Sequence, residues 1–234
     1  MSKLSDIKIS VPTKLFEIPS TGTRVKLRPF RVGDEKALLL ASESDDTSLV
    51  IETLKKLIEN NVEGEYKVDE LAYFDIEALF LQLRAFSVGE TSDILLGCGK
   101  CGEQTQVKID VTDYKIQKQD DLDPVIKISD TFGFKMKFSK IEDMIIAQEK
   151  GGDEFVKLIA KSVEVVFNGD DVIAIGKDEI EDLCTIIEEL TNKQFEKITD
   201  YISGQPKIVK EVKFKCKSCE EENTVELKGL SNFF

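Results

Sequence analysis

Four cysteines, arranged in two pairs of identical spacing, carry the most specific chemistry in this sequence. Cys98 and Cys101 form one C-x-x-C pair, and Cys216 and Cys219 form the second. Two thiolates at this spacing can bind one metal ion from a tight turn, and zinc takes four such ligands in a tetrahedron. The two pairs therefore predict one structural zinc ion per chain, held by all four sulfurs with no position left open for a substrate.

The residues that follow the two pairs also match each other. Apolar residues alternate with polar ones after each pair, which is the period of a half-buried strand. The matching positions are Glu103, Val107 and Ile109 in the first segment and Glu221, Val225 and Leu227 in the second. Each segment is therefore predicted to fold as strand, C-x-x-C turn and strand, and the two hairpins together as a zinc ribbon. The long separation is no obstacle, because the cost of loop closure rises slowly with length.

Three other interpretations of the cysteines remain open. A single C-x-x-C pair can be a thioredoxin-like redox site, although such a site usually lies at the start of a helix and not before a strand. Disulfides within or between the pairs are disfavoured in a reducing compartment. A zinc ion shared between two chains also fits the spacing. Lys100, Lys215 and Lys217 adjoin the sulfurs, where they can offset the negative charge of a four-cysteine site or form a small nucleic-acid patch.

Composition narrows the function classes. The chain has no histidine, so Ser-His and Cys-His nucleophile pairs are excluded, and an enzyme is not expected. The formal net charge of -13 opposes binding to nucleic acid phosphates and to anionic membranes. No apolar run approaches the length of a membrane-spanning helix, and the opening MSKLSDIKIS has no signal-peptide pattern. We therefore expect a cytoplasmic protein that binds neither nucleic acid nor membrane.

The remaining pattern predicts an α+β fold around the ribbon. Proline and glycine punctuate residues 1–30, where a hairpin is predicted with its tip at residues 20–22. A second hairpin is predicted at residues 125–138. Helical periodicity predicts helices at residues 33–60 in two pieces, 66–87, 139–150, 152–167, 177–190 and 191–204. Cys184 falls on an apolar helical stripe, which favours a small buried hydrophobe over a reactive thiol.

These elements suggest three regions. Residues 1–90 form an extended lead-in and a helical unit. Residues 91–112 and 208–234 supply the two halves of the discontinuous ribbon. Residues 113–207 form an inserted hairpin and a mainly helical region.

The last residues of the sequence, GLSNFF, are unusually apolar after a polar strand. Leu230, Phe233 and Phe234 are the apolar side chains of this stretch. Such a segment either packs on its own domain or anchors in a partner's pocket. Both alternatives stay open, and the three residues are candidate partner-binding positions.

Several stretches resemble one phage protein family over nearly the whole chain. They are RVKLRPFRVGDEKALLLASES, YFDIEALFLQLRAFSVGE with the following CGKCG, LTNKQFEKITDYISGQPKI and VKFKCKSCEEENTVELKGLSNFF. The chain with these stretches is similar to the baseplate hub assembly proteins of T-even-like tailed phages. The resemblance implies a non-enzymatic assembly chaperone or minor hub subunit in the cytoplasm of the infected bacterium, with baseplate hub or tail proteins as partners.

Two other functions follow from the cysteine pairs alone. The first is a nucleic-acid-associated zinc-ribbon regulator, and the net negative charge of the chain argues against this function. A thiol oxidoreductase that uses one C-x-x-C pair is the second, and a lack of insulin-reducing activity would remove it.

Overall fold

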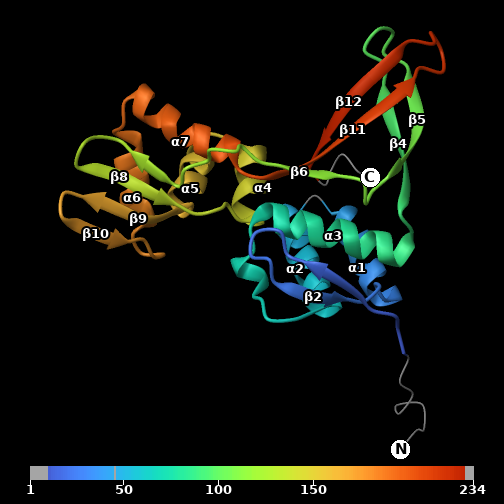
Figure 1. The fold of residues 1–234 in the computed structure, drawn as a ribbon, viewed down its shortest axis with the longest axis horizontal. Coiled ribbons are helices and arrows are strands. Elements are labelled where there is room, and N and C mark those ends of the chain that lie inside the picture. Colours follow the sequence, from blue (N-terminus) through green and yellow to red (C-terminus); the bar gives the residue numbers. More distant parts are fainter. Residues whose placement is uncertain (1–9, 45, 230–234) are drawn as a thin grey trace, which may run out of the picture.

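The computed structural model describes residues 10–44 and 46–229, which form three parts (Figure 1). A helical unit with a small sheet contains the N-terminal third of the chain. A long arm of paired strands projects from it, and a second unit of helices and a sheet lies on the opposite side. Within the described residues no helix combines the length and apolar composition needed to cross a bilayer.

The N-terminal unit begins with the predicted hairpin. Strand β1 (Lys14–Glu17) pairs antiparallel with β2 (Arg24–Leu27), and β2 pairs with the short β3 (Val62–Glu63). Gly22 has a φ of +68° at the tip, where its N–H donates to the Ile18 carbonyl at 2.8 Å. The hairpin predicted around residues 20–22 is therefore confirmed.

The helices of this unit follow the predicted segments. The two helical pieces predicted within residues 33–60 are α1 (Val32–Ser42) and α2 (Thr47–Asn61). Asp46 begins α2 by accepting hydrogen bonds from the N–H groups of Ser48 and Leu49 through its Oδ1 atom. A 3-10 turn at Val68–Glu70 precedes α3 (Tyr73–Val88), which ends at Gly89.

Helix α3 is the common support of the N-terminal unit and the arm. Eleven of its residues are buried. The helix is therefore buried around most of its circumference, unlike an ordinary surface helix, which exposes one polar face. Ile76, Leu79 and Leu83 pack in the core of the N-terminal unit. Ala78 and Leu81 pack instead against strands of the arm. The broad apolar stripe of this segment therefore positions the arm on the helical unit.

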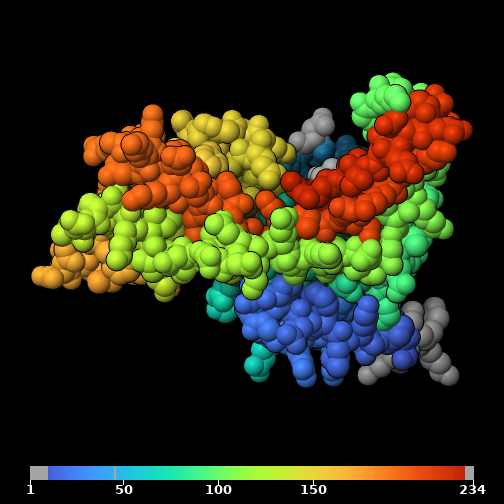
Figure 2. All heavy atoms as spheres, turned by 45° about the horizontal axis from the view of Figure 1, so that its top comes forward, coloured from blue at the N-terminus to red at the C-terminus, as the bar shows by residue number. Residues whose placement is uncertain are grey.

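The arm consists of two antiparallel hairpins and one additional strand. Their strands are β4 (Thr91–Gly97), β5 (Gln104–Asp110), β11 (Lys207–Lys215) and β12 (Glu222–Lys228). Strand β6 (Lys115–Gln117) pairs with the start of β11. The strands predicted on either side of each C-x-x-C pair are confirmed. Figure 2 shows atoms of the first hairpin against atoms of the second at the far end of the arm.

The third part is more sheet-rich than predicted. Its antiparallel sheet has the order β10-β9-β8-β7, from β7 (Val125–Lys127), β8 (Phe132–Met136), β9 (Val163–Asn168) and β10 (Asp171–Ala174). Its helices are α4 (Ile141–Lys150), α5 (Asp153–Lys161), α6 (Ile180–Glu188) and α7 (Asn192–Gly204). The hairpin predicted at 125–138 is confirmed by β7 and β8.

A helix was predicted at residues 152–167, and this prediction is wrong for the residues that follow Lys161. The helix ends there, and residues 163–168 form β9 in the middle of the sheet. The sequence VEVVF is rich in β-branched residues, which suit a pleated surface, but its apolar residues also continue the helical stripe. The range 113–207 therefore contains a four-stranded sheet in addition to helices α4 to α7, which still supply most of its regular structure.

Candidate metal centre

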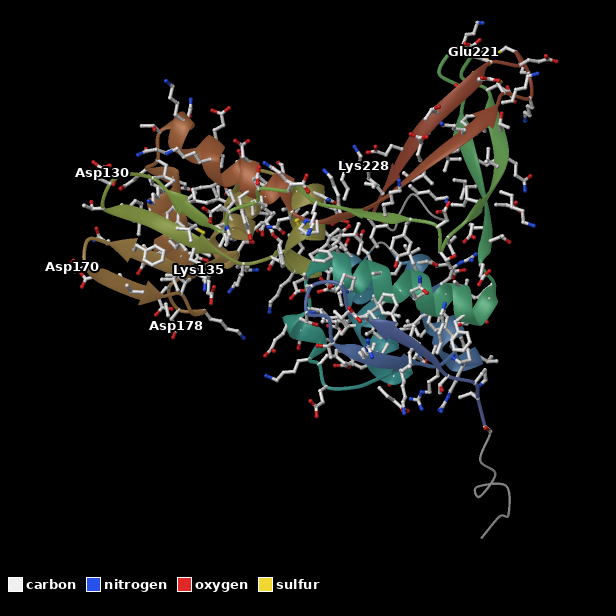
Figure 3. The ribbon with its side chains drawn as sticks, viewed as in Figure 1. Asp130, Lys135, Asp170, Asp178, Glu221 and Lys228 are labelled. Carbon is white, nitrogen blue, oxygen red and sulfur yellow. The ribbon has the colours of Figure 1, made fainter. Side chains whose placement is uncertain are left out.

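The four predicted cysteines meet at the tip of the arm. Figure 3 labels Lys228 near the base of the β11–β12 hairpin and Glu221 near its tip. One ligand atom from each of Cys98, Cys101, Cys216 and Cys219 lies within 4.8 Å of every other. The Sγ atoms of Cys98 and Cys219 are 3.7 Å apart, and those of Cys101 and Cys216 are 3.6 Å apart.

These separations fit a tetrahedral metal ion. With Zn–S bonds of about 2.3 Å, the edges of a regular tetrahedron of sulfurs measure about 3.8 Å. All five cysteines of the chain are free thiols, so no disulfide competes for these sulfurs. The cluster can therefore hold one metal ion with four protein ligands from a single chain.

The two C-x-x-C turns have the same backbone structure. In the first turn the Cys98 N–H donates to the Glu103 carbonyl at 3.0 Å, and the Gly102 N–H donates to the Cys98 carbonyl at 2.9 Å. The equivalent bonds of the second turn are Cys216 N–H to Glu221 at 2.9 Å and Glu220 N–H to Cys216 at 3.1 Å. The repeated sequence pattern thus produces a repeated turn.

The last position of each turn has a left-handed conformation. Gly102 has a φ of +74°, and Glu220, at the equivalent place, has a φ of +59°. Among residues 10–44 and 46–229, Glu220 is the one non-glycine residue with positive φ. Such a conformation costs a residue with a Cβ atom about 1–2 kcal/mol. The second turn therefore carries strain that the first avoids with glycine.

Backbone amides stabilise thiolates at the first cysteine of each turn. The N–H groups of Cys101 and Lys100 lower the pKa of Cys98 to about 6. The N–H groups of Cys219 and Ser218 likewise lower the pKa of Cys216. Metal ligation requires thiolates, so both turns favour the ligating form of their first cysteine.

The second cysteine of the first turn behaves differently. The Glu103 N–H acts to lower the pKa of Cys101, but hydrogen bonding with the neighbouring thiols and burial raise it to about 12. Four thiolates this close repel one another, so some sulfurs keep their protons until a cation is present. This is the electrostatic pattern of a site that releases protons when it binds a metal ion.

Ion pairs cross between the two hairpins next to the sulfurs. Lys100 Nζ lies 2.7 Å from Glu221 Oε2, and Lys217 Nζ lies 3.1 Å from Glu103 Oε1. These contacts are reciprocal, because each turn supplies one lysine and each opposite turn supplies one glutamate. The sequence analysis did not predict these ion pairs. The equivalent positions of Glu103 and Glu221 in the two segments were the pattern that could have indicated them.

The lysines near the site therefore already form ion pairs with glutamates. Lys215, the third, lies 3.0 Å from Glu220 Oε2. Paired lysines present less positive charge to a phosphate backbone, which disfavours the nucleic-acid patch. They still lie close enough to compensate the sulfurs, and hydrogen bonding to Glu221 together with the nearby cysteines raises the pKa of Lys100.

Asn223 adds a further contact between the hairpins. Its Oδ1 accepts from the Gly99 N–H at 3.0 Å, and its Nδ2 lies 3.6 Å from Cys98 Sγ. One side chain of the second hairpin thus orders both the backbone and a sulfur of the first. Such outer contacts orient the ligands of a metal site.

The surroundings of the turns differ from a thioredoxin-like site. Each turn leads into a strand, β5 or β12, and not into a helix. Cys184, the fifth cysteine, lies on α6 among residues that pack on the core of the third part. Burial raises its pKa, which opposes reactivity and agrees with the predicted structural role.

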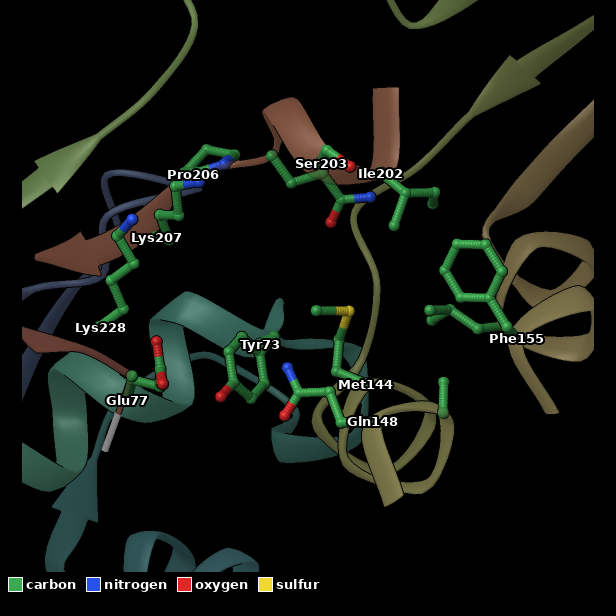
Figure 4. A pocket seen from close by; sticks show the side chains of 14 residues that line it. Tyr73, Glu77, Met144, Gln148, Phe155, Ile202, Ser203, Pro206, Lys207 and Lys228 are labelled. Carbon is green, nitrogen blue, oxygen red and sulfur yellow. The ribbon is translucent and has the colours of Figure 1, made fainter. Parts of the chain in front are cut away.

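The predicted partner-binding residues Leu230, Phe233 and Phe234 lie outside the described residues. The described chain stops at Gly229, beside a pocket of about 480 Å³ between α3, α4 and α7 (Figure 4). Tyr73, Glu77 and Met144 line this pocket. Sequence reasoning missed it, because the buried Glu77 falls within an apolar helix whose neighbours are set only by tertiary packing.

Comparison with known proteins identifies the family. The sequence model of one family, described as T4 bacteriophage base plate protein, matches residues 11–234. No curated protein matches the chain, and no solved structure matches it. Because the family match covers both C-x-x-C turns and nearly the whole chain, the protein belongs to the T4 bacteriophage base plate protein family.

Proposed function

We propose that this protein is a non-enzymatic assembly factor or minor subunit of the phage tail baseplate hub. It acts by binding other hub or tail proteins in the cytoplasm of the infected bacterium, and a retained subunit would remain in the baseplate of the virion. The observation that carries this proposal is the family match over residues 11–234. Baseplate proteins work by association, so protein–protein binding is the activity the family implies.

We propose further that the four cysteines hold one structural zinc ion. Support comes from sulfur separations of 3.6 and 3.7 Å, the matching turns and the all-thiolate donor set. Soft thiolate ligands in a closed tetrahedral set suit Zn²⁺. The ion would supply stability to the tip of the arm and would leave no open coordination position for chemistry.

The shape of the molecule supports a binding role for the arm. Strand β11 has nine residues, which span about 30 Å at roughly 3.3 Å per residue. The arm therefore carries the cysteine tip far from α3, as Figure 1 shows. A rigid projection of this kind presents its end to a neighbouring subunit, and a metal ion at the tip would fix its shape before the partner arrives.

A pull-down from phage-infected cells tests this function. Tagged full-length protein is expected to recover baseplate hub or tail proteins, and the Cys216→Ser variant is expected to recover them less well. Cys184→Ala serves as the matched cysteine control and should behave as the unmodified protein. Recovery of host transcription or translation factors alone, by all three proteins, would contradict the proposal.

A further inference from the structure

Strand β10 is an edge strand of the sheet in the third part of the molecule. The sheet has the order β10-β9-β8-β7, so its two edges are β10 and β7. Figure 1 shows β10 on the outer border of this part, away from the arm. Within residues 10–44 and 46–229, β10 pairs with β9 alone. The backbone groups on its outer side therefore have no partner strand.

The register of the β9–β10 hairpin identifies these outward groups. Asn168 pairs with Asp171 across the turn, and at the other end the Ile175 N–H donates to a carbonyl of β9 at 3.0 Å. Antiparallel residues alternate between pairs that exchange hydrogen bonds and pairs that do not. Every second residue from Asp171 to Ile175 therefore bonds to β9. The N–H and C=O groups of Val172 and Ala174 point the other way, toward solvent.

The opposite edge of the same sheet differs from β10. Strand β7 follows Pro124, and the N–H of Val125 donates to Asp123 Oδ1 at 2.8 Å. The carbonyl of Lys127 accepts a hydrogen bond from Lys197 Nζ at 2.8 Å. Proteins protect sheet edges with proline, with charged side chains and by covering them. The last three residues of β10 are apolar and lack such protection, so this is the edge open to another strand.

The side chains of β10 add apolar surface to this edge. Val172 is 67% exposed and Ile173 is 46% exposed. Ile173 pairs with the core residue Val166, whereas Val172 pairs with Phe167 on the other face of the sheet. A neighbouring strand lies about 4.8 Å away and covers side chains on both faces. A strand added here therefore gains apolar contacts as well as backbone hydrogen bonds.

Acidic side chains flank this edge at both ends. Asp170 and Asp171 lie at the turn, and Asp178 and Glu179 follow the end of β10. All four residues are exposed, and Figure 3 labels Asp170 and Asp178. Lys177 is the one basic residue between positions 168 and 182. Complementary charge favours association, so the strand that fits this edge carries positive charge at its ends.

We propose that β10 binds an extended segment of a partner protein as an additional strand of the sheet. The segment has alternating apolar residues and lysine or arginine at both ends. A second copy of this chain fits poorly, because two β10 strands paired about a two-fold axis bring the acidic turn of one beside the acidic end of the other. The surface is separate from the cysteine tip, so the proposal holds whether or not the arm binds a hub protein.

A short synthetic peptide tests the proposal on the full-length protein. The probe has blocked termini and a lysine at each end of alternating valine and threonine residues. Amide hydrogen exchange, followed by NMR for each residue, should slow by roughly tenfold or more at Val172 and Ala174 when the peptide is added. The amide of Val125 on the opposite edge should not change. A peptide with methylated backbone nitrogens is the control and should not slow exchange.

A proline variant tests whether the backbone of β10 makes the contact. Ala174→Pro removes one outward N–H and no hydrogen bond to β9, so it should weaken peptide binding by at least roughly threefold to tenfold, the factor for one hydrogen bond. Ala174→Val keeps the N–H group and should bind the peptide as well as the unmodified protein does. Equal affinity of the two variants would overturn the proposal.

A charge reversal tests the proposed chemistry of the partner. Asp170→Lys with Asp171→Lys should weaken binding of the lysine peptide and strengthen binding of the same peptide with glutamate at both ends, and salt should reduce both effects. Asp120→Lys with Asp121→Lys changes the net charge equally on the loop between β6 and β7. An equal effect of the two double variants would contradict recognition at β10.

Two further outcomes would overturn the proposal. The first is a peptide that neither binds nor slows exchange at Val172 and Ala174. The second is slow exchange at these amides without peptide, in a dimer detected by sedimentation, which would assign the edge to a second copy.

Discussion

Removing one sulfur from the arm should loosen its tip and leave the rest of the molecule folded. We consider Cys216→Ser, because Cys216 is 2% exposed and lies 3.6 Å from Cys101. The variant is expected to lose the metal ion. The question is how much stability remains at the tip without it.

The structure allows an estimate. The two ion pairs that cross between the hairpins are 44–64% exposed, and exposed pairs of this kind contribute about 0.2–1 kcal/mol each. A structural zinc ion contributes about 10–16 kcal/mol in small zinc-binding peptides. A zinc ion bound to the four sulfurs would therefore supply most of the free energy that joins the two hairpins at the tip, because an isolated hairpin is at best marginally stable.

The base of the arm has another source of stability. Ile94, Ile109 and Leu227 are buried there in one cluster with Ala78 and Leu81 of α3. We expect the loss of metal to free residues 97–104 and 215–222, while this cluster persists. Stability is then lost locally and not by global unfolding.

Hydrogen exchange by mass spectrometry, together with metal analysis, provides the assay. The unmodified protein should bind one zinc ion per chain and protect the amides of both turns. Cys216→Ser, and the unmodified protein treated with a chelator, should lose the metal and that protection while keeping protection in α3. The reasoning is refuted if the turns stay protected after the metal is lost, or if α3 exchanges as fast as the tip.

Other variants test separate parts of the argument. Gly102→Ala should destabilise the tip by about 1–2 kcal/mol, because φ is +74° there. Gly99→Ala is its control and should cost less; equal effects on tip exchange would exclude the conformational explanation. Asp75→Ala should lower the global free energy of unfolding by about 2–4 kcal/mol in denaturant titrations, because this buried carboxylate accepts three hydrogen bonds. A smaller change would mean that water accepts these hydrogen bonds in the variant. Cys184→Ala should keep one zinc ion per chain, and loss of metal from it would contradict the four-ligand assignment.

The sequence was sufficient for the elements that have local causes. Alternation of apolar and polar residues is a property of a strand itself, so β5 and β12 were predictable, and so was the turn between β1 and β2 at residues 20–22. The spacing of the cysteines identified the four sulfurs as one group, because zinc chemistry demands four ligands wherever they lie in the chain.

Tertiary structure decided what depends on neighbours. Residues 163–168 continue a helical apolar stripe, yet they form β9 because β8 and β10 lie on either side to complete their hydrogen bonds. The reciprocal contacts between Lys100 and Glu221 and between Lys217 and Glu103 exist only after the two hairpins meet. The pocket between α3, α4 and α7 likewise has no sequence pattern of its own, because its walls come from helices that are distant in the chain.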